Sequence, residues 1–162
     1  MSDDAFEGAC TCGDIEYRLT SVPLFVHCCH CTWCQRESGS AFALNALIET
    51  ARLQRLHGEP VMVNTPSNSG KGQQVARCPR CHVALWSHYA GAGEAFAFVR
   101  VGTLRQPDRL PPDIHIFTST RLPWVSLPAN TPAVAEYYDR NAYWPAQSLA
   151  RRTAVLAGTT GS

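Results

Sequence analysis

The chain has 162 residues, of which 45% are hydrophobic, and a formal net charge of +1. This length and composition fit one domain with its own hydrophobic core. The absence of a basic cluster argues against nucleic acid as the main partner, because neutralising phosphates requires grouped Lys and Arg. The first ten residues lack the basic and apolar segments of a signal peptide, and no apolar run reaches the roughly 20 residues of a membrane span. We therefore expect a soluble, cytoplasmic protein that does not contact membranes.

Short alternating or apolar segments, separated by Gly, Pro, Asn and Ser, predict a mainly β domain. The expected strands cover residues 14–19, 24–29, 41–48, 60–65, 72–78, 83–89, 95–104 and 113–120. The polar segment 64–73 is rich in Gly and Ser and predicts an exposed loop.

Helix signals are few. Residues 31–38 are expected to form one or two helical turns. Thr131 as a cap and Pro132 at the first helical position predict a helix over residues 131–140. A last short helix is expected over 145–155. These elements predict a single domain over residues 1–155, followed by a flexible tail at 156–162.

Eight cysteines fall into three tight groups, which are Cys10 and Cys12, then Cys28, Cys29, Cys31 and Cys34, then Cys78 and Cys81. An even number of cysteines in an exported protein would indicate disulfides. In a reducing compartment, however, grouped cysteines are typical of metal ligation. We therefore predict metal sites.

The first and last groups complement each other. Cys10 and Cys12 supply two thiolates, and Cys78 and Cys81 supply two more. Four thiolates complete a tetrahedron, which is typical of a closed structural zinc site. Such a site would join the start of the chain to a hairpin in its middle and stabilise a β-rich fold.

The middle group contains Cys29, Cys31 and Cys34 at CxCxxC spacing. Three thiolates leave the fourth position of a zinc ion free for water or substrate, as in catalytic sites. The alternative is that His27 or His30 closes the site, making it structural.

Strand alternation separates the neighbours of these cysteines. His27, Cys29 and Cys31 would share one face of a strand, and Cys28 and His30 the other. Cys28 is then interpreted as a small buried hydrophobe. His27 remains a candidate for a fourth ligand or for a hydrogen-bonding neighbour of the site.

Taken together, several motifs closely resemble the glutathione-dependent formaldehyde-activating enzyme family, also called the centromere-protein-V family. The resemblance covers about residues 5–152. Its motifs are "CTCGDIEY", "CHCTWCQRESGSAFALNALI", "CPRC" followed by "LWSHY", "RVGTL", "PPDIHIFTSTRLPWV" and "YYDRNAYWPAQSLARR". The order CxCG, CHCxxC, CxxC is the specific part.

The resemblance implies a β-tent, a fold of small antiparallel sheets with bound zinc, here followed by short C-terminal helices. It implies two zinc ions per chain. The structural zinc ligands would be Cys10, Cys12, Cys78 and Cys81, and the catalytic zinc ligands Cys29, Cys31 and Cys34. The implied activity joins formaldehyde to glutathione, giving S-hydroxymethylglutathione, and is classed as carbon–sulfur lyase activity from the reverse direction.

One residue departs from the family pattern. The last pair usually reads CxxCG, and here His82 stands at the Gly position. Gly in that place eases a left-handed turn, which His tolerates better than a β-branched residue does. We interpret His82 as a local backbone variant.

The resemblance also directs attention to residues that could receive glutathione. Arg36, Arg100 and Arg121 are candidates for its carboxylates, because Arg offers two parallel donors. Arg36 is preferred because it follows the catalytic cysteines by two residues. The alternative for each Arg is an ordinary solvated side chain.

Four further residues stand in matching segments and are candidates to line the pocket: Ser38, Asn45, His115 and Trp124. His115 has a suitable ordinary pKa for a general acid or base. Its alternative is a hydrogen-bonded surface histidine.

Two other functions remain open from sequence. One is a zinc-stabilised binding module without turnover, because fold does not fix function. The other is an enzyme of the same fold that acts on another thiol or aldehyde.

Overall fold

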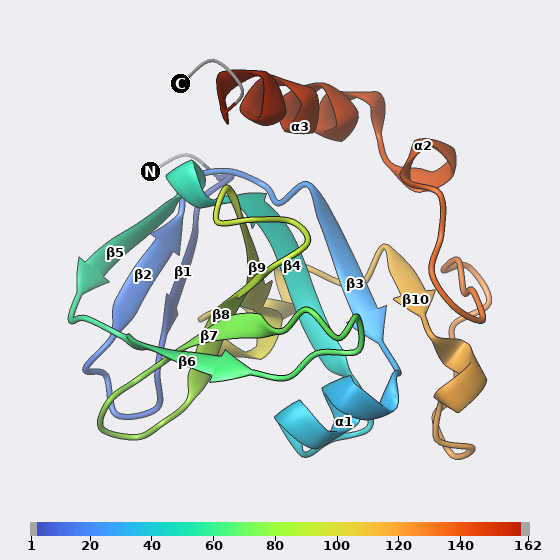
Figure 1. Cartoon of the computed structure of the whole chain (residues 1–162), viewed down its shortest axis with the longest axis horizontal. Coiled ribbons are helices and arrows are strands. Elements are labelled where there is room, and N and C mark those ends of the chain that lie inside the picture. The colour runs from blue at the N-terminus through green and yellow to red at the C-terminus, as the bar shows by residue number, and fades with distance from the viewer. Residues whose placement is uncertain (1–2, 160–162) are drawn as a thin grey trace.

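The computed structural model describes residues 3–159, and two sheets form its body (Figure 1). The smaller sheet has three antiparallel strands in the order β1 (Phe6–Ala9), β2 (Glu16–Leu19) and β5 (Leu53–His57). The fold is mainly β, as the sequence predicts.

The larger sheet has seven strands. Their order across the sheet is β10 (Ile114–Ile116), β3 (Phe25–Cys29), β4 (Ala43–Glu49), β9 (Phe96–Arg100), β8 (Ala84–Tyr89), β7 (Gln73–Arg77) and β6 (Val61–Thr65). All neighbouring strands are antiparallel except β10 and β3, which run parallel.

The helices of the described residues are short. They are α1 (Thr32–Ser38), α2 (Arg140–Tyr143), α3 (Ala146–Thr159) and the 3₁₀ turns Thr50–Arg52, Val101–Thr103, Pro107–Arg109 and Thr118–Thr120. Within residues 3–159, none of the helices has the length and apolar character needed to cross a membrane.

The main core lies between the two sheets. Tyr17 of β2 is fully buried and packs edge-on against Trp86 of β8, with ring centroids 5.5 Å apart. Its hydroxyl is 2.6 Å from Thr103 Oγ1, which satisfies the buried polar atom. Gly8 on the neighbouring strand leaves room for this ring, since a Cβ there would overlap it.

A second apolar cluster holds β3 and β10 against the C-terminal segment. Phe25 stacks on Trp144 at 5.7 Å between ring centroids, and Ile114 and Ile116 are buried beside them. Cys29 and Cys31 belong to the same cluster. The candidate site is therefore built on a packed wall and does not stand on a free loop.

All eight expected strands occur, but two strands are missing from the sequence prediction. The strands β1 and β5 are short, and β5 is largely exposed and carries an irregular mixture of polar and apolar residues. Two expected strands also end early. After Arg100 and after Ile116 the chain turns into 3₁₀ helix, and Phe117 adopts a left-handed backbone with φ of 54°.

The predicted helix over 131–140 is wrong. This segment is extended and lies along the open edge of β10, where His115 N–H donates to Pro132 O and Val134 N–H donates to His115 O, each at 2.9 Å. The edge of β10 offers backbone partners that a helix would leave unused. The helix starts only at Arg140, and Asp139 caps it.

The last helix, α3, is longer than predicted. It continues to Thr159 and so includes the first four residues of the expected tail, while residues 160–162 lie outside the described residues. In Figure 1 the helix lies across the upper ends of the central strands. Ser148 Oγ donates to Leu24 O at 2.7 Å, and Arg151 reaches Glu49 of β4 through two hydrogen bonds of 2.8 and 2.6 Å.

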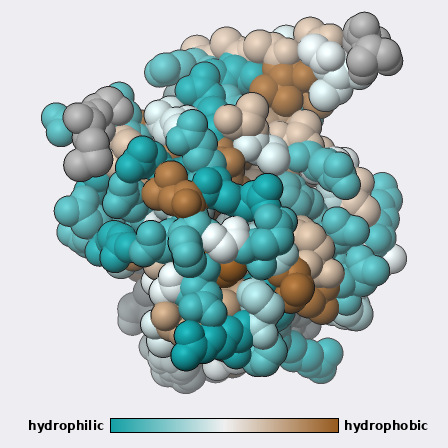
Figure 2. Space-filling model, turned by 90° about the vertical axis from the view of Figure 1, so that its left-hand side faces the viewer, coloured by the Kyte–Doolittle hydropathy of each residue, from teal (hydrophilic) through white to brown (hydrophobic). Residues whose placement is uncertain are grey.

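The face at the left of Figure 1, beside the small sheet, is mostly hydrophilic. Figure 2 shows only isolated apolar areas on it. Single exposed apolar side chains of this kind are usual on globular proteins. The chemical interest of the molecule therefore lies in its cysteine groups and the pocket beside them.

The Arg151–Glu49 pair gives a testable pH dependence. Burial alone would raise the pKa of Glu49, but its hydrogen bonds to Arg151 hold that pKa below the usual range. The pair therefore stabilises the fold above the unfolded-state pKa of about 4.3, and this contribution is lost as the pH falls through the lower folded-state value.

We expect Arg151→Ala to reduce the free energy of unfolding by about 2 kcal/mol at pH 7, because it removes charged hydrogen bonds from a buried carboxylate. Urea unfolding at pH 7 and pH 3 measures this, and the difference between variant and native protein should shrink at pH 3. Arg55→Ala, which breaks an exposed ion pair with Glu59, is the control and should change little. An equal effect of both variants would contradict the assignment.

Candidate metal centres and the pocket beside them

Four cysteines from distant parts of the chain meet between the two sheets. Cys10 and Cys12 lie in the turn between β1 and β2, and Cys78 and Cys81 lie between β7 and β8. Their sulfur atoms all lie within 4.8 Å of one another, and Cys12 Sγ is 3.6 Å from both Cys10 Sγ and Cys78 Sγ. A tetrahedral zinc with Zn–S distances of 2.3 Å separates its sulfurs by about 3.8 Å. The group therefore fits a closed zinc site.

Backbone donors prepare these sulfurs for negative charge. Ile15 N–H donates to Cys10 Sγ at 3.3 Å, and Cys81 N–H donates to Cys78 Sγ at 3.5 Å. A hydrogen bond from the backbone of Val83 lowers the pKa of Cys81 to about 6. Donors aimed at sulfur favour the thiolate, which is the form that binds zinc.

His82 adopts the left-handed backbone that its place in the turn requires, with φ of 64°. Its N–H donates to Cys78 O at 2.9 Å, and Cys78 N–H donates to Val83 O at 3.1 Å. Among the described residues, His82 does not belong to the four-sulfur group. It shapes the turn that carries the ligands.

The second group is Cys29, Cys31 and Cys34, whose sulfurs also lie within 4.8 Å of one another. Cys29 ends β3, Cys31 is the N-cap of α1, and Cys34 lies in the first turn of that helix. The N–H of Cys34 donates to Cys31 Sγ at 3.3 Å. The strand-to-helix turn therefore brings all three sulfurs together.

The three thiols affect one another's ionisation. Hydrogen bonds from Cys29 and Cys34 lower the pKa of Cys31 to about 2, and the same contacts raise the pKa of Cys34 far above its ordinary value. The three thiols thus readily hold one negative charge as a thiolate, and repulsion from that thiolate opposes ionisation of the other two. A cation between the sulfurs removes that repulsion, so the donor set fits a metal ion.

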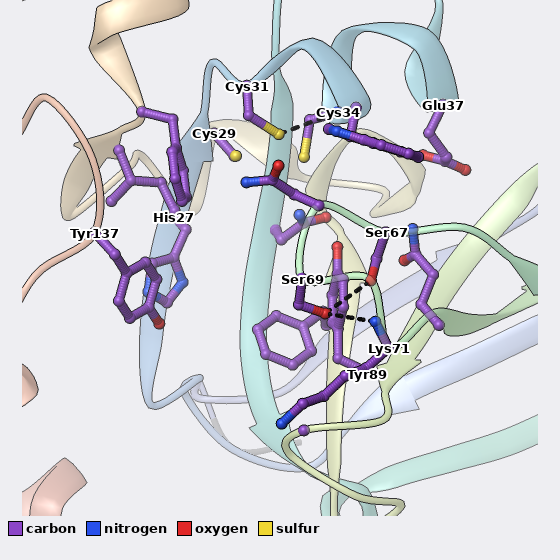
Figure 3. Close-up of a pocket in the computed structure, with 18 of the residues that line it drawn as sticks. His27, Cys29, Cys31, Cys34, Glu37, Ser67, Ser69, Lys71, Tyr89 and Tyr137 are labelled. Atoms are coloured by element: carbon purple, nitrogen blue, oxygen red, sulfur yellow. Dashed lines mark hydrogen bonds between the residues drawn. The ribbon is translucent and has the colours of Figure 1, made fainter.

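These three cysteines border a pocket of about 500 Å³. Figure 3 shows them at one end of the cavity, with Ser67, Ser69 and Lys71 on a loop across from them. The loop joins β6 to β7, and β4, β8 and β9 supply the floor. The cysteine group therefore opens onto a space large enough for a small organic molecule.

His27 lines this pocket but is not a member of the sulfur group. Its Nε2 is 2.5 Å from the hydroxyl of Tyr138, which accepts a hydrogen bond from Trp144 Nε1 at 2.8 Å. Burial lowers the pKa of His27 to about 4, so the ring is neutral at pH 7. His27 is thus held as part of the pocket wall. Among the described residues, the group keeps three ligand atoms, the sulfurs of Cys29, Cys31 and Cys34.

A third group lies on the opposite face of β3, as strand alternation predicts. Cys28, His30 and His115 are buried there, with His30 Nε2 2.9 Å from His115 Nδ1 and 3.6 Å from Cys28 Sγ. Their number and type would suit a metal ion, but the ring nitrogens are at hydrogen-bond distance from each other.

His115 is therefore not in the pocket, contrary to the role expected from sequence. The parallel pairing of β10 with β3 sets His115 opposite Cys28, on the face away from Cys29. Burial lowers the pKa of His115. The ring has no path to a substrate beside the three cysteines.

Asn45 does line the pocket, together with Arg100. Arg100 Nη1 donates to Asn45 Oδ1 at 2.5 Å, and its Nη2 donates to Glu37 of α1 and to Ser87 of β8 at 2.9 and 3.0 Å. Glu37 also accepts from Arg77 at 2.9 Å. Arg100 is thus paired with Glu37 and connects α1 to the sheet.

Arg36 and Ser38 do not line the pocket. Trp33, Cys34 and Glu37 form the pocket face of α1, and Arg36 is exposed off that face. Ser38 Oγ donates to Cys34 O at 2.8 Å and closes the end of the helix. Closeness to Cys34 in sequence suggested a place in the pocket, but the helical turn directs the side chains of Arg36 and Ser38 away from it.

Trp124 and Arg121 are also absent from the lining residues. Trp124 is 74% exposed, in the segment after the turn Thr118–Thr120. The guanidinium of Arg121 donates to the carbonyl of Val125. Both residues belong to the outer connection between β10 and the C-terminal segment.

Sequence reasoning missed two groups of pocket residues. Tyr89 ends β8 and faces the same side as Ser87, so strand alternation could have placed it once Ser87 was located. Burial raises the pKa of Tyr89, and negative charges at Cys34 and Cys29 raise it further, so its phenol stands within electrostatic reach of the sulfurs. The loop residues Ser67, Ser69 and Lys71 gave no signal beyond their polarity.

Comparison with known proteins decides the family. The profile described as "Glutathione-dependent formaldehyde-activating enzyme" matches residues 5–120, which is more than half of the chain. The chain belongs to this family. The matched residues include all three cysteine groups.

A solved crystal structure of a Rhodobacter sphaeroides protein is also similar, with 17% sequence identity and a TM-score of 0.46. The alignment covers 79% of this chain and 99% of that one. No curated protein matches the chain.

The two cysteine groups should differ in how strongly the stability of the fold depends on them. We expect Cys78→Ser to lower the melting temperature strongly or prevent folding, because the closed site joins two hairpins. We expect Cys34→Ser to keep the fold and to lose one zinc ion per chain. Metal content by mass spectrometry and thermal unfolding by circular dichroism measure both effects.

Cys28→Ser is the matched control, because Cys28 belongs to neither zinc group. It should keep the zinc content of the native protein. Equal folding defects in Cys34→Ser and Cys78→Ser would show that both sites are structural.

Proposed function

We propose that this protein catalyses the addition of a thiol to an aldehyde and the reverse cleavage, with glutathione and formaldehyde as the substrates. The supporting observation is the group of Cys29, Cys31 and Cys34, which has three ligands and faces a pocket of about 500 Å³. The family to which the chain belongs is named for this chemistry.

The reaction adds the S–H of a thiol across the carbonyl of formaldehyde. A carbon–sulfur bond forms, and the thiol proton ends on the former carbonyl oxygen as a hydroxymethyl group. Cys29, Cys31 and Cys34 would hold a zinc ion, which would supply a positive charge that favours the thiolate form of the thiol near neutral pH. In the reverse direction the carbon–sulfur bond breaks and the hydroxyl proton is released.

The chain itself must handle the proton on oxygen. We assign this to Tyr89, whose raised pKa keeps the phenol protonated, so that it can donate its proton to the developing alkoxide. The thiol proton passes to solvent, and solvent returns a proton to the phenolate, so the net reaction moves one proton from sulfur to oxygen. Its ring packs edge-on against Phe98 at 4.7 Å, which fixes its direction. His27, neutral and hydrogen-bonded to Tyr138, forms another part of the pocket wall without adding charge.

The network around Arg100 positions the sulfurs. Glu37 lies one turn after Cys34 on α1 and is held by both Arg100 and Arg77. A shift of α1 would move Cys31 and Cys34 together. The network therefore sets the distance between the sulfurs and the floor of the pocket.

Exchange NMR tests the activity directly. With glutathione and ¹³C-labelled formaldehyde, the native protein should speed exchange between formaldehyde hydrate and S-hydroxymethylglutathione above the spontaneous rate. Tyr89→Phe should slow the catalysed exchange about 100-fold, the usual scale for losing a general acid. Tyr137→Phe, which alters another tyrosine lining the same pocket, is the control and should retain activity.

Exchange at the spontaneous rate with zinc-loaded native protein would refute the activity. Binding of glutathione without turnover would then support the binding module, and turnover with other thiols would support a different substrate. Equal losses of activity in Tyr89→Phe and Tyr137→Phe would refute the assignment of the proton donor to Tyr89, but not the activity itself.

A further inference from the structure

One cation that borders the pocket, Lys71, has no part in the mechanism proposed above. Lys71 is the only lysine in the chain and lines the pocket from the β6–β7 loop, residues 66–72. We propose that this loop is a subsite for a carboxylate with a neighbouring N–H group, so that the thiol substrate is of the peptide type. This proposal rests on the proposed function and adds to it where the far end of the thiol binds.

The charges of the pocket leave Lys71 free. Apart from the cysteines, its charged lining residues are Glu37, Arg100 and Lys71. Glu37 and Arg100 pair with each other at 2.9 Å, so both charges already have a partner in the protein. Within residues 3–159, the ammonium of Lys71 has no hydrogen-bond or ion-pair partner. Lys71 therefore offers an unpaired cation across the pocket from the cysteines (Figure 3).

The loop that carries Lys71 is held by its own hydrogen bonds. Ser67 Oγ accepts from Gly72 N–H at 3.1 Å and lies 3.0 Å from Ser69 Oγ. Ser69 Oγ in turn accepts from Lys71 N–H at 3.2 Å. Gly70 and Gly72 have positive φ of 77° and 81°, which lets the chain close this turn. The base of Lys71 is thus fixed, while its long side chain can reach a ligand.

A second polar group beside the loop lacks a partner. Gln73 is 9% exposed and lines the same pocket. Its Nε2 donates to Pro66 O at 3.4 Å, but its buried Oε1 has no hydrogen-bond partner among the described residues. An unsatisfied buried acceptor costs about 1–3 kcal/mol, so it favours a ligand that supplies an N–H.

Lys71 and Gln73 indicate the chemistry of the ligand. The exposed ammonium of Lys71 can pair with an anion, and Gln73 Oε1 can accept from a donor on the same ligand. A carboxylate next to an amide or ammonium N–H, as at either end of a peptide, meets both needs. A thiol on the same molecule would then extend toward Cys29, Cys31 and Cys34 at the other end of the pocket.

None of the arginines expected from sequence provides this function. Arg100 is already paired, and Arg36 and Arg121 lie outside the pocket. Lys71 is the remaining cation among the described lining residues. It therefore replaces Arg36 as the candidate for recognising glutathione carboxylate.

The subsite is tested by binding, separately from turnover. S-methylglutathione carries both carboxylates but cannot add to an aldehyde. Isothermal titration calorimetry on the zinc-loaded protein should show binding, weakened about fivefold by Lys71→Gln, since a carboxylate–ammonium pair at a partly solvated site contributes about 1 kcal/mol. Lys71→Arg should retain most of the affinity. Arg36→Gln, which also removes one positive charge from an exposed side chain, should bind like the native protein.

Ligand variants identify the carboxylate. The ethyl esters of S-methylglutathione at the glycine or the glutamate end each lack one negative charge. One ester should bind the native protein more weakly, and Lys71→Gln should cause no further loss with that ester. This non-additivity is the signature of a direct contact.

Turnover separates the subsite from the proposed function. If the protein is active, Lys71→Gln should raise KM for glutathione and leave the reaction of 2-mercaptoethanol unchanged, because that thiol has no carboxylate. If neither thiol reacts, the proposed function fails and the calorimetry alone decides the subsite. Unchanged affinity in Lys71→Gln, equal losses in Arg36→Gln, or no binding of S-methylglutathione to the native protein would each overturn the proposal.

Discussion

The two-residue period of β3 is the constraint on which the candidate site depends. It directs Cys29 to the pocket and Cys28 to the opposite face, and the turn after it returns Cys31 and Cys34 to Cys29. The parallel pairing of β10 then adds His115 to the side of Cys28. A stretch that is over-supplied with ligands is thereby divided into two groups that cannot share one ion. The strand takes Cys28 and His30 away from the pocket, and His27 lines the pocket without joining the three sulfurs.

The two sulfur centres are connected through ordinary side chains. Arg77 directly precedes Cys78, donates to His82 O at 3.1 Å and pairs with Glu37 on α1. Glu37 also pairs with Arg100 on β9, next to the floor of the pocket. Arg77 and Glu37 thus connect the four-sulfur group to the sheet and helix that carry the three-sulfur group. The centre proposed to stabilise the fold and the centre proposed for chemistry share one framework, with different numbers of sulfurs.

Much of this arrangement could be predicted from sequence, and the failures have physical causes. The group of Cys29, Cys31 and Cys34 and the separation of Cys28 and His30 could be predicted, because they are local properties of a strand and its turn. The four-sulfur group could be predicted because two separate cysteine pairs each need two further ligands to complete a tetrahedron. The helix over 131–140 failed because the open edge of β10 offers that segment hydrogen bonds that sequence does not reveal. The prediction that Arg36 lines the pocket was wrong because Cys34 and Glu37 occupy the pocket face of α1, and Arg36, one position before Glu37, points away from it. Lys71 was seen only as part of a polar loop, since nothing local to a loop says which cavity it borders.

The central claim is that one centre is closed by four sulfurs and the other has three sulfurs and an open position. Cadmium-113 NMR on the cadmium-substituted protein tests it most directly, because the chemical shift of the ion responds to the number of sulfur ligands. The account predicts two signals, of which only one moves when a thiol is added and disappears in Cys34→Ser. A single signal, or two signals that both ignore added thiol, would contradict it.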